Sequence, residues 1–522
     1  MQDNRKVAKA GLLMAAAAAV CRVISAVKEV GVAYVFGAAA VTDAYALAML
    51  IPSLGMSLFV AAVRRAFLAR HAAYQRRGQQ IAEDHANQFV SSLLLTALVV
   101  ALAVAATGRL AWRFLILSQA EGLIEASLPL VLPASLLIIP IALIAGLTAV
   151  LNARQRFALP QLTAALPTLA ICCGLVWFGK QAGAMGLLVS LLIGSVVQML
   201  VLVVMVHRAG HRLRWRLDWR SPSLRALWAF AGPLILLDLI SQGNVFVDRS
   251  MATLIGEDGK VAILTWSGLL RDFIQGTLIA SLLAVLLPHF SGQVARGATD
   301  ELGYSCSLVL RYAATFLFPV SALLLIVCPV LFSHFQVGAL DAAASFAIAN
   351  CLVAYGLSLF ADLSSTTMYQ ALVVLGRLRT LLLLAVFVNC IPNFVFNLLL
   401  LKPLGEVGLA LSTVGVGYLT LLANYLVLRR TIRVDEEWKT WRVVAGSLVA
   451  TLVCGAVAFL VLRACRYACP ASVAGDVVAV TVAVMAFLGL YGGVQLVYPG
   501  NESARRGWQI IRDYVKSRVS RR

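Results

Sequence analysis

Charged and amide side chains interrupt four long apolar stretches of this chain, near residues 9–30, 43–63, 226–249 and 261–288. They are Arg22, Lys28 and Glu29 in the first stretch, Asp43 in the second, Gln242, Asn244, Asp248 and Arg249 in the third, and Arg271 and Asp272 in the fourth. A charge at the centre of a membrane costs about 3 kcal/mol, so it is kept mainly for binding, for ion movement or for holding helices together. These ten residues form the candidate binding site.

The basic residues among them suit an anionic ligand. Arg22 lies near the middle of its stretch, and Glu29, seven residues later, lies close to the same helical face. A guanidinium fork matches the oxygens of a phosphate group, and Gln242 and Asn244 offer polar atoms to a sugar or a peptide amide. We therefore predict a cation-lined cavity that suits a polyanionic headgroup such as a diphosphate.

Structural roles compete with this interpretation. They are a buried ion pair for Arg22, a helix cap for Asp43, snorkelling for Lys28 and Glu29, and a local pair of Asp248 with Arg249. The sequence has no P-loop and no recognisable hydrolase, kinase, zinc or haem motif. We expect neither enzyme activity nor a metal or cofactor.

The composition is that of a helical membrane protein. Hydrophobic residues make up 61% of the 522 residues and charged residues 13%, and the mean hydropathy is +0.89. Each spanning helix needs about 20 mostly apolar residues, and long unbroken runs such as 90–106 and 128–151 exclude the alternating strands of a barrel. We predict an all-α polytopic protein of about fourteen transmembrane helices.

The basic residues support this topology. With both termini in the cytoplasm, 32 of the 43 Lys and Arg residues fall in cytoplasmic segments and nine on the outer side, as the positive-inside rule requires. The net charge of +19 therefore reflects the orientation of the helices in the membrane. Because the basic residues lie in short loops between spans, nucleic-acid binding is excluded as a main function. We expect a bacterial inner-membrane protein whose basic tail either lies as an interfacial helix on anionic membrane lipids or is a frayed end of the chain.

The two halves of the chain resemble each other. Gly183-Ala-Met-Gly186-Leu-Leu-Val-Ser190 recurs 222 residues later as Gly405-Glu-Val-Gly408-Leu-Ala-Leu-Ser412, and Phe36-Gly37 recurs 219 residues later as Ile255-Gly256. Two parallel six-helix repeats suit alternating access. The predicted division is a six-helix lobe at 1–206, a basic cytoplasmic linker at 207–225, a second six-helix lobe at 226–430, two additional helices at 431–498 and a basic cytoplasmic tail at 499–522.

In its motifs the chain resembles the MurJ/MviN family, the lipid II flippases of the multidrug/oligosaccharidyl-lipid/polysaccharide exporter superfamily. The matching residues are Cys21-Arg22, Lys28-Glu29, Phe36-Gly37, Thr42-Asp43-Ala44-Tyr45, Ile51-Pro52-Ser53, Asn152-Ala-Arg-Gln-Arg-Phe157, Gln242 with Asp248-Arg249, Leu287-Pro288 and Pro403-Leu-Gly-Glu-Val-Gly-Leu-Ala-Leu-Ser412. The resemblance implies a two-lobed bundle that moves an undecaprenyl-diphosphate-linked saccharide, lipid II first, from the inner to the outer leaflet by alternating access. By position it gives cavity roles to Arg22, Lys28, Glu29 and Asp43.

The chain also departs from the family pattern. Met56 and Ser57 replace a pair of arginines, and Ser267-Gly268-Leu269 replaces an Ala-Asp-Arg. Alternatives are therefore a flippase for another polyprenyl-linked glycan such as O-antigen or exopolysaccharide, an ion-coupled drug antiporter, and a non-transporting scaffold for cell-envelope synthesis proteins. The driving force expected for a flippase is the membrane potential or a monovalent ion gradient.

Overall fold

The computed structural model describes residues 2–56, 58–59, 63, 67–68, 71, 74–76, 78–116, 121–154, 156, 158–278, 280–434, 436–468 and 472–497. Within these residues every named element is a helix, and a single isolated β-bridge joins Val337 to Leu340. The predicted all-α class is confirmed. The interfacial tail predicted at 499–522 and the predicted cytoplasmic residues Arg64, Arg65, Arg70 and Arg77 lie outside the described part of the chain.

The chain divides into two compact units. Unit 1 comprises Met1–Ala262 and Val337–Asp341. Its helices are α1 (Gln2–Phe36), α2 (Ala40–Ala48), α3 (Leu50–Met56), α5 (Gln79–Leu115), α6 (Glu121–Ser127), η2 (Leu128–Leu130), α7 (Val131–Leu136), α8 (Ile138–Ala153), α9 (Ala158–Thr163), α10 (Ala165–Phe178), η3 (Gly179–Ala182), α11 (Gly183–Arg208), α12 (Pro222–Ala252) and η4 (Thr253–Ile255).

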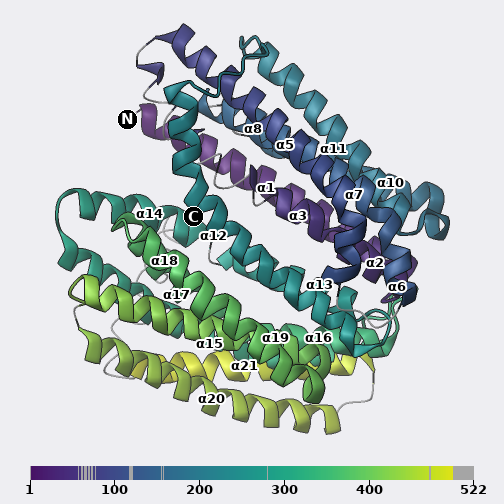
Figure 1. Ribbon diagram of the computed structural model, residues 1–522. Helices are drawn as coiled ribbons and strands as arrows, with labels where there is room; N and C mark the ends of the chain where they lie inside the picture. Colours follow the sequence, from purple (N-terminus) through teal and green to yellow (C-terminus); the bar gives the residue numbers. More distant parts are fainter. Residues whose placement is uncertain are drawn as a thin grey trace. The chain divides into compact units, whose positions relative to one another are not determined.

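In unit 1, α10 packs against α1 and α11, and α8 packs against α5 and α11 (Figure 1). Glycine permits a close approach between α10 and α11, because a Cβ atom at Gly194 of α11 would lie 2.5 Å from the backbone of Pro167 in α10. Small residues at helix contacts are typical of membrane bundles, where close packing replaces the hydrophobic effect between helices.

Unit 2 comprises Ile263–Gln336 and Ala342–Arg522. Its helices are α13 (Lys260–Leu278, whose first turn belongs to unit 1), α14 (Ala280–Ala295), α15 (Thr299–Ser333), α16 (Ala342–Gly356), α17 (Leu359–Val374), α18 (Leu378–Leu384), the π-helix η5 (Ala385–Cys390), α19 (Ile391–Thr431), α20 (Glu437–Ala468) and α21 (Val473–Val497). Helix α15 packs against α16, α17, α20 and α21, and the hydroxyl of Tyr491 on α21 donates to the carbonyl of Thr315 on α15 at 2.8 Å.

Nine helices within the described residues are long and apolar enough to cross a membrane, or ten if the bent pair α16–α17 is one span. One of them, Leu378–Thr431, has 54 residues, enough for two spans of about 20, and the non-helical residue Gly405 divides it. The other predicted spans are α1, α2 with α3, and α13 with α14. The multi-pass membrane fold is thus confirmed, and the count of fourteen stays a prediction.

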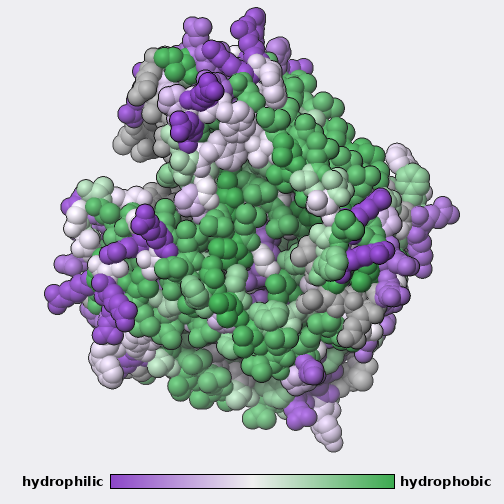
Figure 2. All heavy atoms as spheres, in the orientation of Figure 1, coloured by the Kyte–Doolittle hydropathy of each residue, from purple (hydrophilic) through white to green (hydrophobic). Residues whose placement is uncertain are grey.

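The surface of these helices fits a membrane. Figure 2 shows hydrophobic residues along the flanks of the helices and hydrophilic residues gathered near their ends. Helix α5 illustrates the pattern, since Leu98, Val99 and Leu102 are all large, apolar and exposed. In water such side chains would be unfavourable, whereas in lipid they face a matching solvent.

Paired glycines support the internal repeat. Gly183 and Gly405, which match in sequence, both have φ of +55°, and the matching pair Gly37 and Gly256 have φ of +64° and +79°. Glycine adopts these left-handed angles without the steric penalty of a side chain. The two halves therefore turn in the same way at equivalent places.

The boundary between the units does not follow the repeat boundary, because α12 packs in unit 1 against α3 and α5. The segment predicted as a linker is held along α5 as well: the Asn87 amide donates to the carbonyl of Arg212 at 3.3 Å, and the backbone N–H of Arg216 donates to Ser91 at 3.1 Å. The lobe division drawn from the repeat remains a prediction.

Candidate functional site

Helix α1 carries the cations predicted for the site. The Lys28 ammonium and the Glu29 carboxylate form an ion pair at 2.5 Å, and their side chains are 17% and 29% exposed. Arg22 is half-buried on the same helix. Tyr45 of α2 interacts electrostatically with both Lys28 and Glu29. Lys28 and Glu29 thus lie near Tyr45 of α2, and Glu29 balances the charge of Lys28.

Asp43 has a structural role that the sequence did not specify. Its side chain is buried, and its two carboxylate oxygens accept from the backbone N–H groups of Gly259 and Ala262, each at 2.7 Å. Gly259 directly precedes α13 and Ala262 lies in its first turn, where N–H groups lack partners within the helix, so Asp43 caps a helix more than 200 residues away. The sequence had suggested a cap at its own helix, where Thr42 instead accepts from the N–H of Ala39 at 2.9 Å.

Three chain reversals interlock beside this cap. A Cβ atom at Gly259 would lie 2.5 Å from the carbonyl oxygen of Ala38, so only a residue without a side chain fits there. The N–H of Ala339 donates to the carbonyl of Tyr34 at 2.9 Å. Together with Asp43, these contacts join the end of α1 to the segments 256–262 and 337–341 within unit 1.

Helix α12 brings the amide-bearing residues to unit 1. Gln242, Asn244 and Asp248 are half-buried along it. The Arg249 guanidinium donates from Nη1 to the carbonyl of Ala46 in α2 at 3.3 Å. Arg249 thus contacts α2, the helix that carries Asp43, and its local pairing with Asp248 stays a prediction.

In unit 2 the predicted residue Arg271 is paired with a carboxylate. Its Nη2 atom lies 2.8 Å from Oδ2 of Asp362 on α17, and the two side chains are 19% and 20% exposed. The guanidinium also lies over the ring of Tyr355, 5.3 Å from its centroid, a favourable contact between a cation and an aromatic face. Its neighbour Asp272 is exposed.

A break between α16 and α17, bent by 45°, positions Asp362. Ser358 occupies the cap of α17, and its hydroxyl lies 2.6 Å from Oδ2 of Asp362. The amide of Gln275 also donates to this oxygen. The first turn of a half-helix carries partial positive charge, and broken helices in transporters commonly place such ends at polar sites.

Sequence reasoning missed Asp362, Ser358 and Tyr355. The signal was available, because Asp362 is a lone carboxylate within the apolar stretch 342–370, and an ionisable residue at such a place is a functional candidate. That it pairs with Arg271, 91 residues away, depends on how the helices pack and could not be obtained from spacing.

Each unit thus places basic side chains beside carboxylates within its membrane helices. In such an arrangement a phosphate group can replace the carboxylate as the partner of the arginine or lysine, because both offer the same kind of charge-assisted hydrogen bond. Within the described residues, no three His, Cys, Asp or Glu side chains gather closely enough to hold a metal ion.

Comparison with known proteins gives a consistent result. The model of the family "Lipid II flippase MurJ" matches residues 32–471. A protein of Synechocystis sp. named "Probable lipid II flippase MurJ" is 25% identical over 88% of each chain. A protein of the same name from Vibrio cholerae is 23% identical over 81% of this chain and 83% of its own.

Two solved structures share the fold. One, titled "Lipid II flippase MurJ, inward closed conformation", has a TM-score of 0.73 at 17% identity and covers 92% of this chain and 98% of its own. The other is an inward-facing multidrug resistance transporter of the MATE family, with a TM-score of 0.63 at 14% identity over 78% of this chain and 93% of its own.

Proposed function

This chain belongs to the lipid II flippase MurJ family, and we propose that it carries lipid II, an undecaprenyl-diphosphate-linked saccharide precursor of peptidoglycan, from the inner to the outer leaflet. The proposal includes alternating access between two lobes, an inner-membrane location and cytoplasmic termini. The family is one of transporters, which agrees with our expectation that the chain is not an enzyme.

The observation that carries the proposal is the placement of basic residues within membrane helices of both units. Arg22 and Lys28 lie on α1, and Arg271 lies on α13. A guanidinium or ammonium in the membrane interior is costly unless an anion accompanies it, and the diphosphate of a polyprenyl-linked lipid offers these cations the same kind of partner as the resident carboxylates. A drug antiporter for cationic substrates would favour carboxylates without these cations.

Transport in proteoliposomes tests the proposal. Fluorescent lipid II would be placed in both leaflets and the outer-leaflet label quenched chemically, so that any further loss of signal measures flipping. We expect the wild-type protein to accelerate this loss, and Arg22→Ala to abolish the acceleration while protein insertion stays normal. No acceleration by correctly inserted wild-type protein would contradict lipid II transport.

A second cargo has specific support. Met56 and the segment 267–269 lack arginines that the family pattern contains, so another polyprenyl-linked glycan is the alternative substrate. The same assay with undecaprenyl-diphosphate-linked O-antigen repeat units distinguishes the two. Faster flipping of that lipid than of lipid II would favour the alternative.

The driving force and the topology are further parts of the proposal. We expect flipping to depend on the membrane potential or on a monovalent ion gradient, and ionophores that collapse each one separately would identify which. A reporter fused after Arg522 should be active only in the cytoplasm. Reporter activity in the periplasm would contradict an even number of spans.

A further inference from the structure

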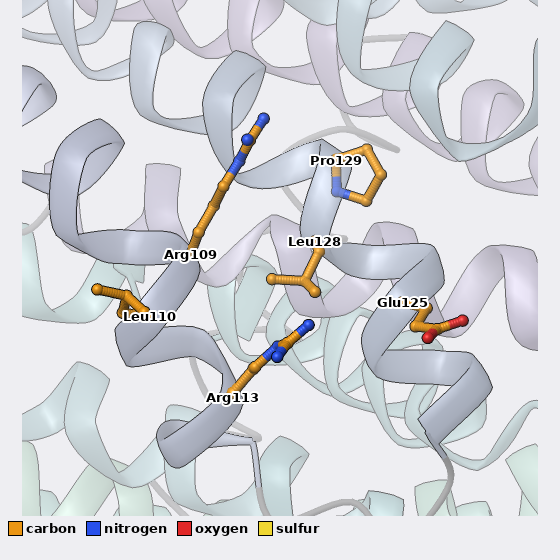
Figure 3. Close-up of a pocket in the computed structure, with 6 residues that line it drawn as sticks. All are labelled: Arg109, Leu110, Arg113, Glu125, Leu128 and Pro129. Atoms are coloured by element: carbon orange, nitrogen blue, oxygen red, sulfur yellow. The ribbon is translucent and has the colours of Figure 1, made fainter.

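A pocket of about 420 Å³ lies in unit 1 where α5 ends and α6 begins (Figure 3). Arg109, Leu110 and Arg113 of α5 form one side, and Glu125 of α6 with Leu128 and Pro129 of η2 form the other. The volume is within the range of about 300–1,000 Å³ found for small-molecule sites. None of these six residues belongs to the candidate site described above.

Two arginines give this pocket its charge. Arg109 and Arg113 are four residues apart, hence on one face of α5, and both are exposed. Within the described residues, neither guanidinium has an ion-pair or hydrogen-bond partner. Like charges at this spacing destabilise a helix by about 0.2–0.5 kcal/mol. The partial negative charge at the end of a helix favours Arg113 in the last turn, but that effect falls off before it reaches Arg109.

The only carboxylate among the lining residues does not neutralise the arginines. In Figure 3 the Glu125 carboxylate points away from both guanidinium groups, and Arg113 extends toward Leu128. With two positive charges and one negative charge, the lining residues are net positive. A guanidinium without a protein partner at a concave site is a natural phosphate ligand, because its donors match phosphate oxygens two at a time.

The pocket also lies at the end of a span, where lipid headgroups are expected. The apolar span of α5 ends at Phe114, and the next span begins at Glu121. Leu110 and Phe114 are 72% and 85% exposed beside the arginines. Exposed apolar side chains next to cations at the end of a span fit the boundary between acyl chains and phosphate groups.

The pocket walls are held together by buried contacts. Trp112 of α5 is buried, and its indole N–H donates to the hydroxyl of Ser127 in α6 at 2.9 Å. This bond fixes the end of α5 against the start of the next span, so Arg109 and Arg113 are presented on a preformed surface. A preformed site binds its ligand with less loss of conformational entropy.

We propose that the pocket of Arg109 and Arg113 binds the phosphate group of a membrane lipid at the surface expected to face the outer leaflet. Two lipids carry this chemistry there, an anionic glycerophospholipid and the delivered polyprenyl-diphosphate cargo. The second source rests on the proposed function, and the first does not.

Lipid binding to the full-length protein in detergent tests the proposal, with native mass spectrometry to count bound lipids. The ligands are phosphatidylglycerol, undecaprenyl diphosphate, phosphatidylcholine and inorganic diphosphate. The variant is Arg109→Gln with Arg113→Gln, and the matched control is Lys180→Gln with Lys402→Gln, which removes two other exposed cations expected on the same side. Thermal unfolding verifies that both variants fold.

We expect the pocket variant to bind phosphatidylglycerol, undecaprenyl diphosphate or both about tenfold more weakly, which corresponds to about 1.4 kcal/mol, while the control keeps wild-type affinity. The lipid that loses affinity identifies the source. Equal loss in the control, no loss in the pocket variant, or binding of inorganic diphosphate as tight as that of the lipids would overturn the proposal. If the wild-type protein does not flip lipid II, the proposed function is contradicted. The test of phosphatidylglycerol binding at the pocket stays valid in that case.

Discussion

Separate removal of Arg271 and Asp362 should have unequal effects on stability. Oδ2 of Asp362 is close to three donors, from Arg271, Gln275 and Ser358. Asp362 is the only described residue whose carboxylate forms a salt bridge with Arg271, and the Nε atom of that arginine is buried without a hydrogen-bond partner. Removal of the Arg271 side chain therefore leaves the carboxylate with two other donors, whereas removal of the carboxylate leaves the guanidinium without a counter-ion.

The expected magnitudes follow from this difference. Asp362→Asn leaves a largely buried guanidinium without its counter-ion and should lower the free energy of unfolding by about 3–5 kcal/mol. Arg271→Met leaves the carboxylate with two donors at a helix start and should lower it by about 1–3 kcal/mol. In the double variant, the two effects should fall short of additivity by about 1–3 kcal/mol.

Unfolding by titration with a denaturing detergent, followed by circular dichroism, measures these differences. Arg296→Met is the control, because its ion pair with Glu301 is exposed at 67% and 62% and should contribute less than about 1 kcal/mol. A larger effect of Arg271→Met than of Asp362→Asn, or strict additivity in the double variant, would refute the reasoning.

Three further predictions concern unit 1 and the repeat. Asp43→Ala removes both acceptors for Gly259 and Ala262 and should lower the free energy of unfolding by about 2 kcal/mol, with a smaller loss for Asp43→Asn. Thermal unfolding in which Asp43→Asn is less stable than Asp43→Ala would contradict the cap. Burial, aided by the nearby charges of His211 and Arg154, lowers the pKa of His71 to about 4. The unfolded state, where this pKa is near 6.5, then binds more protons, so stability should fall as the pH drops from about 6.5 to 4, and His71→Gln should flatten that part of a melting profile. Gly405→Ala, at φ of +55°, should destabilise by about 1 kcal/mol or more, whereas Gly489→Ala, at a helical position with open space around it, should not.

The membrane class and the turns of the repeat could be predicted because they depend on local properties. Apolar length determines where helices cross lipid, and a glycine with left-handed angles marks a turn wherever it occurs. Gly183 and Gly405 show this, since a match in sequence corresponds to a match in backbone angle.

The partners of the site residues could not be predicted from the sequence. Asp43 bonds to backbone groups of residues 259 and 262, and Arg271 pairs with residue 362. Such contacts depend on which helix ends meet after packing, and hydropathy does not encode them. The division into units could not be predicted for the same reason, because it depends on the contacts of α12 with α3 and α5.

Rescue of cells depleted of their own lipid II flippase tests the central claim most directly, with a probe for lipid II exposed on the outer leaflet. We predict that expression of this chain restores growth and outer-leaflet lipid II, and that Arg22→Ala at equal membrane levels restores neither. Correctly inserted wild-type protein that leaves lipid II in the inner leaflet would contradict the account.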